Sequence, residues 1–160
     1  MKALLCFVIV SGSALVWAAE PKVDPKLKVS KEEQEVLDLV NEIRAKEKLP
    51  VLKPHAILFS VARAHAVNQG KQKKVEHMLD GKAPWDRVED AGYDYATCNE
   101  NVAWLPKWSA KELVDGWMNS KVHRDNILGK KFKETGIGIF EDKEKGKGGF
   151  YIAEVFASQR

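Results

Sequence analysis

The stretch "GFYIAEVFA", residues 149–157, decides the architecture, because apolar side chains occupy both faces of this predicted strand. Successive side chains of a strand point to opposite faces, so Phe150 and Ile152 share one face while Tyr151 and Val155 share the other. A sheet that is apolar on both faces must be covered on both sides. We therefore predict an α+β fold, a three-layer α-β-α sandwich with the sheet between two helical layers.

Two further strands are predicted before this one. "ETGIGIFED", residues 134–142, is joined to it by a charged, glycine-rich segment that is typical of a hairpin tip. "YATCNENVAWL", residues 95–105, alternates apolar and polar residues over its length. So few strands are expected to form a small antiparallel sheet.

Four helices are predicted from capping signals and apolar spacing. Ser30 with Glu33, and Ser109 with Glu112, each match the capping box that begins a helix. Proline suits the first turn of a helix, and the other two helices are placed on that basis. The four helices begin after Ser30, at Pro54 (ending near Gly70), at Pro84 (ending at Gly92) and after Ser109.

The N-terminal residues indicate export. Lys2 precedes a short apolar run, and "VWA", which ends at Ala18, has small residues at the two positions that a signal peptidase reads. We predict a signal peptide over residues 1–18, an extended leader over 19–29 and one domain over 30–158. The chain is then secreted or extracytoplasmic, in the periplasm or at the cell surface, with no transmembrane span after cleavage. A retained membrane anchor is the alternative.

Charge and cysteine content limit the classes of binding partner and the disulfides that this chain could have. The chain has 26 basic and 23 acidic residues, and its lysines are spread along the sequence, which argues against nucleic-acid binding. Cys98 is the only cysteine after cleavage, so no disulfide can form within the mature chain. Its thiol is expected either to be buried and inert in a monomer or to link two chains in a dimer.

Two carboxylates, Glu100 and Glu154, lie among large apolar residues on predicted strands. A charged carboxylate in such a place is costly unless it is paired or hydrogen-bonded. His77 and His123, each 23 residues from Glu100, are plausible donors. The plainer alternatives are that Glu100 accepts backbone N–H groups and that Glu154 lies on a wet edge strand. His65 is expected to be a core histidine.

Five segments together carry a family resemblance. They are "LVNEIRAKEKLPVLK", "ENVAW", "WMNSKVHRDNIL", "GIGIF" and "YIAEVFA", in this order. The chain resembles the CAP superfamily, also called the SCP domain, which includes cysteine-rich secretory proteins, venom allergens and plant pathogenesis-related proteins. The resemblance spans about residues 33–157 and is closest to the bacterial branch.

The resemblance implies an α-β-α sandwich with a cleft that holds two histidines and acidic partners. These positions fall on His77, Glu100 and His123. A further glutamate of animal members falls near Ser120, and Glu154 is our own candidate to replace it. Two histidines and one carboxylate would suit zinc or another divalent cation with an open position, or equally a hydrogen-bonded network. No cofactor is expected to be required.

The favoured interpretation is therefore a secreted binding or interaction module, with a small-molecule, lipid, peptide or glycan ligand at this cleft. The alternative is a metal-dependent, protease-like hydrolase that uses the same cleft, with zinc on His77, His123 and Glu100 and with Glu154 as general base. Against the hydrolase, catalytic zinc motifs usually place two histidines four residues apart on one helix, and this chain does not. A third interpretation is that the network only stabilises the fold.

Overall fold

The computed structural model describes residues 27–144 and 148–160. The predicted signal peptide and most of the predicted leader therefore lie outside the described residues. Within the described part, no helix combines the length and the apolar character that a membrane crossing requires.

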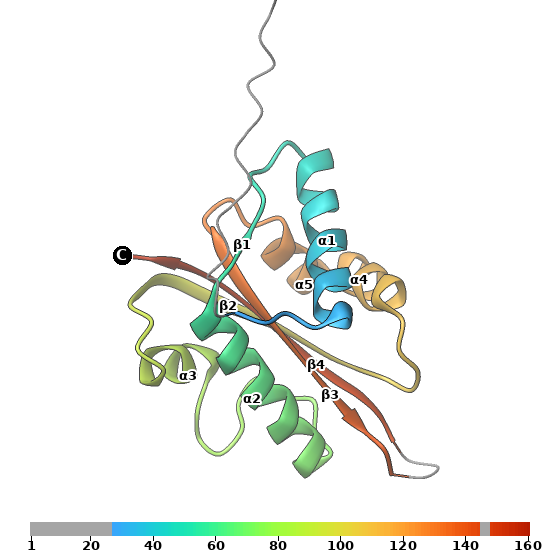
Figure 1. Ribbon diagram of the computed structural model, residues 1–160. Coiled ribbons are helices and arrows are strands. Elements are labelled where there is room, and N and C mark those ends of the chain that lie inside the picture. The colour runs from blue at the N-terminus through green and yellow to red at the C-terminus, as the bar shows by residue number, and fades with distance from the viewer. Residues whose placement is uncertain (1–26, 145–147) are drawn as a thin grey trace, which may run out of the picture.

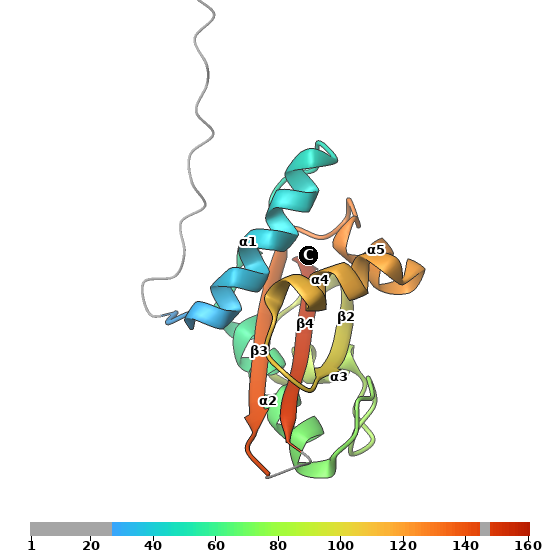
Figure 2. The same ribbon diagram turned by 90° about the vertical axis from the view of Figure 1, so that its right-hand side faces the viewer.

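A sheet lies between two helical layers, as predicted (Figure 1). Its strands run in the order β1-β3-β4-β2. One layer is built by α2 and α3, and the other by α1, α4 and α5 (Figure 2). The bounds are α1 Lys31–Lys46, β1 Lys53–Pro54, α2 Ala56–Gln72, α3 Pro84–Asp90, β2 Tyr95–Leu105, α4 Ala110–Asn119, α5 Lys121–Ile127, β3 Glu134–Asp142 and β4 Gly149–Gln159.

The sheet differs from the prediction at one edge. The hairpin β3–β4 and the pairing of β2 with β4 are antiparallel, but β1 pairs with β3 in parallel, so the sheet is mixed. Pro54 lies in β1 and not in the first turn of α2, which begins at Ala56. A proline has no N–H to donate and is tolerated on such an edge strand, while the next residue, His55, donates its N–H to the carbonyl of Thr135.

The predicted helix starts are otherwise confirmed. Ser30 and Glu33 form both bonds of the capping box of α1, and the Ser109 hydroxyl accepts the N–H of Glu112 at the start of α4. One helix was not predicted. Ser120, at the end of α4, has an extended backbone with ψ of 120°, and a further helix, α5, begins at the next residue.

Glycines in β3 allow α2 to lie directly on the sheet. A Cβ atom at Gly136 would lie 2.0 Å from the carbonyl carbon of Leu58, and one at Gly138 would lie 2.2 Å from that of Ala62. Backbone atoms cannot move aside as a flexible side chain can, so only glycine fits at either position. This close contact brings the buried side of α2, including His65, onto the face of the sheet that carries Glu100.

Candidate functional site

Glu100 on β2 is the centre of a buried polar cluster. Its side chain is fully buried, and its two oxygens have different partners. Oε1 lies 3.0 Å from Nδ1 of His77, and Oε2 accepts a 2.8 Å bond from a terminal guanidinium nitrogen of Arg87. Nε2 of His65 lies 3.7 Å from Oε1. We refer to these four residues, His65, His77, Arg87 and Glu100, as the Glu100 cluster.

His77 is the exposed member of the cluster. Its side chain is 48% exposed, and it lies in the loop between α2 and α3. An ionised carboxylate can only accept, so the neutral imidazole carries its proton on Nδ1 and donates it to Glu100. The other ring nitrogen, Nε2, is then left as an acceptor. The carboxylate thus fixes both the orientation and the tautomer of this ring.

Arg87 was not identified from the sequence. Besides Glu100, the guanidinium donates to the backbone carbonyls of His77 at 3.0 Å and of Lys82 at 2.8 Å. It therefore holds the loop that carries His77 against β2. The only sequence signal was that Glu100 needed a donor, and arginine is the side chain best suited to a carboxylate.

His65 was predicted to be a core histidine, and it is 1% exposed. Its Nε2 lies 2.9 Å from the carbonyl oxygen of Glu76, which can only accept, so the proton is on Nε2. Burial lowers the pKa of His65 below its ordinary value. The neutral ring therefore borders the cluster on its buried side. The apolar spacing of α2 indicated that His65 is buried but not that it lies beside Glu100.

His123 on α5 lies beside the cluster, not on the carboxylate. Burial, and secondarily the neighbouring His77, lower its pKa. Its ring makes no hydrogen bond to Glu100 among the described residues, and its backbone carbonyl accepts a 3.1 Å bond from Asn101. Asn126 on the same helix donates to the carbonyl of Glu100 at 3.2 Å and to the side chain of Asn101 at 2.8 Å. These asparagines attach α5 to β2.

Glu154 is not brought to this site. Opposite positions in the register are Glu100 with Val155 and Asn101 with Glu154, so the two glutamates point to opposite faces of the sheet. Glu154 is buried under the α1–α4–α5 layer and accepts a 3.2 Å bond from the Thr135 hydroxyl. Burial raises its pKa to about 8.

The side chains of the cluster, as they are placed, do not fit a divalent cation. Nowhere in residues 27–144 and 148–160 are three or more histidine, cysteine, aspartate or glutamate side chains grouped so that they could hold a metal ion. Both oxygens of Glu100 already accept bonds, one of them from a cation. Nε2 of His65 is used by the carbonyl of Glu76.

Cys98 lies two residues before Glu100, on the same face of β2. It is partly buried, and it forms no disulfide with any described residue. Burial raises its pKa to about 12, so the thiol stays protonated at neutral pH. A protonated thiol is a poor nucleophile, which favours the inert role over the reactive one.

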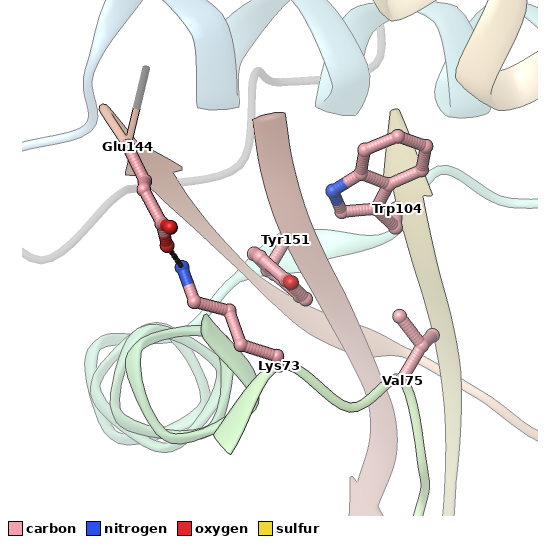
Figure 3. Close-up of a pocket in the computed structure, with 5 residues that line it drawn as sticks. All are labelled: Lys73, Val75, Trp104, Glu144 and Tyr151. Carbon is pink, nitrogen blue, oxygen red and sulfur yellow. Dashed lines mark ion pairs between the residues drawn. The ribbon is translucent and has the colours of Figure 1, made fainter. Parts of the chain in front are cut away.

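A pocket of about 500 Å³ opens further along the same face of β2 (Figure 3). Trp104 lies four residues after Glu100, and this residue is 42% exposed. Tyr151 lies opposite it on β4, and Val75 belongs to the loop that carries His77. The ion pair of Lys73 with Glu144, 3.0 Å long, borders the pocket on another side. The Glu100 cluster and an exposed aromatic pocket therefore share one strand and one loop.

Comparison with known proteins identifies the type of domain. The model of the cysteine-rich secretory protein family, CAP, matches residues 37–157. An uncharacterised protein of Bacillus subtilis, YkwD, is 34% identical over 114 residues, which are 71% of this chain and 44% of that protein. An uncharacterised membrane protein of the same organism, YlbC, is 29% identical over 67% of this chain and 31% of its own length. The chain thus spans less than half of either relative.

Solved structures share the fold. An outer surface protein of Borrelia burgdorferi superposes with a TM-score of 0.72 at 19% identity, over 84% of this chain and 97% of that one. An extracellular protein of Bacillus anthracis that contains an SCP domain superposes with a TM-score of 0.71 at 25% identity, over 80% of this chain and 40% of that one.

Proposed function

The chain belongs to the cysteine-rich secretory protein (CAP) family, and on that basis we propose that it is a secreted binding module whose ligand docks at the Glu100 cluster. One observation carries the proposal. The buried carboxylate of Glu100 is fully engaged by Arg87 and His77, while the ring of His77 is held in place through Nδ1 and its side chain is 48% exposed. A carboxylate engaged in this way orients its neighbours and is not free to act as a general base.

The chemistry of the exposed groups suggests the ligand class. A neutral His77 offers an acceptor, so it suits ligand groups that donate, such as hydroxyl or N–H groups. The indole of Trp104 adds a flat apolar surface nearby on the same face of β2. A peptide or an envelope glycan combines these features better than an inorganic ion does.

Secretion is part of the same proposal. The apolar N-terminal segment suits a signal peptide, and two similar proteins are described as an outer surface protein and an extracellular protein. We expect the mature chain to act outside the cytoplasm, at the cell surface or in the medium.

The test is titration of the mature chain with soluble peptidoglycan fragments, a mixed peptide library and lipid vesicles, one class at a time. We expect one class to shift the imidazole NMR signals of His77 and the indole signal of Trp104. Trp104→Ala should weaken this binding. Trp85→Ala, which removes another exposed tryptophan that lies on α3, is the matched control and should not.

The same samples decide between binding and turnover. Assays on casein, peptidoglycan and ester substrates should give no rate that depends on His77. Turnover that is abolished in His77→Phe would replace the binding function by a hydrolase. A large loss of melting temperature in that variant, with ligand binding unchanged, would leave the cluster with a structural role only.

A further inference from the structure

We propose that Arg87 is the built-in counter-ion of Glu100 and makes the Glu100 cluster selective against divalent metal ions. Arg87 is then a positioning and specificity-determining residue. The inference deepens the proposed binding function, because it names a class of ligand that the site rejects. Its test uses a metal ion alone, so its failure would leave the binding function standing.

The first argument is occupancy. A divalent cation that used Glu100 as a ligand would need one of its two oxygens. The guanidinium of Arg87 lies 2.8 Å from one of them, and Nδ1 of His77 lies 3.0 Å from the other. The side chain of Arg87 is only 13% exposed, so this pair is largely shielded from water. Shielding strengthens the attraction between the two charges and makes the guanidinium difficult to displace.

The second argument is charge. The buried pair of Arg87 and Glu100 is already neutral, so the cluster has no excess negative charge to attract a metal ion. A divalent ion at His77 would instead be repelled by the guanidinium, which bonds to the carbonyl of that same residue. The remaining partners, His65 and His77, are imidazoles, and an imidazole brings no negative charge in either of its protonation states.

The third argument is geometry. Arg87 bonds at once to Glu100 on β2 and to the carbonyls of His77 and Lys82 in the loop. Arg87 therefore does two things at once. It bonds to the carboxylate of Glu100, and it holds the loop where His77 can form its hydrogen bond with the same carboxylate. Removing Arg87 leaves a buried carboxylate without its cation, and such a group recruits another cation or a proton.

The experiment is calorimetric titration of the mature chain with zinc chloride near neutral pH, in protein purified without a polyhistidine tag. The wild type is expected to bind zinc weakly or not at all. In Arg87→Met, which keeps an unbranched stem but removes the charge, we expect zinc affinity to rise by about 100-fold. Adding His77→Phe to this variant should abolish the gain.

Two matched variants distinguish a specific effect of the Arg87 charge on zinc affinity from a general loss of stability. Arg63→Met breaks another arginine–glutamate pair, the 2.6 Å contact with Glu33 on α1, which is not part of the Glu100 cluster, and should gain no zinc affinity. Arg87→Lys keeps the positive charge and should continue to exclude zinc even if it loses some stability. Tight zinc binding by the wild type that depends on His77 overturns the inference. So does tight binding by Arg87→Lys, or a gain of less than about tenfold in folded Arg87→Met.

Discussion

Replacing the buried Glu154 by glutamine should remove a strong pH dependence of stability. Burial raises the pKa of Glu154 from its ordinary 4.5 to about 8. The folded protein thus keeps a proton that the unfolded chain has already lost between these two values. The free energy of unfolding must therefore fall as the pH rises through this window.

The magnitude follows from the pKa shift. At about 1.36 kcal/mol per pKa unit, a rise from 4.5 to about 8 corresponds to about 5 kcal/mol over the whole window. About 4 kcal/mol of this lies between about pH 5 and about pH 8. Glutamine resembles the protonated side chain and can still accept the bond from the Thr135 hydroxyl, so Glu154→Gln should not show this loss.

Urea unfolding of both proteins across that pH range, followed by tryptophan fluorescence, measures the effect. Between about pH 5 and about pH 8, the wild type should lose about 4 kcal/mol of unfolding free energy relative to Glu154→Gln. Glu141→Gln, at an exposed position on β3, is the control and should follow the wild type. If the Glu154→Gln difference stays constant within about 1 kcal/mol, then Glu154 is ionised in the folded state and the reasoning fails.

Three further predictions concern other parts of the chain. Gly138→Ala places a Cβ atom 2.2 Å from the backbone of α2 and should cost about 3 kcal/mol in urea unfolding, whereas Gly116→Ala, with open space around it, should cost nothing. Because the pKa of Cys98 is about 12, iodoacetamide should label it far more slowly in the native than in the urea-unfolded protein, and rapid native labelling would contradict a buried thiol. N-terminal sequencing of the exported chain should show cleavage after Ala18, and an intact N-terminus would indicate a retained anchor.

Most of the secondary structure could be predicted because its signals are local. The capping box at Ser30 and the alternating pattern of residues 95–105 involve residues a few positions apart, and both predictions are confirmed. The layering followed from "GFYIAEVFA", since a strand that is apolar on both faces needs a cover on each. The exceptions are β1, whose two residues carry no periodicity, and α5, which a single extended residue at Ser120 separates from α4.

The contacts of the candidate site depended on tertiary structure. The sequence indicated that Glu100 and Glu154 both needed partners, but only the register shows that they lie on opposite faces, because a shift of one residue reverses the face of every side chain. It suggested His77 near Glu100, and their atoms do meet. It could not indicate Arg87 or His65, because their contacts with Glu100 join separate elements packed over one face of the sheet. Local patterns specify which elements form, and long-range packing specifies which side chains meet.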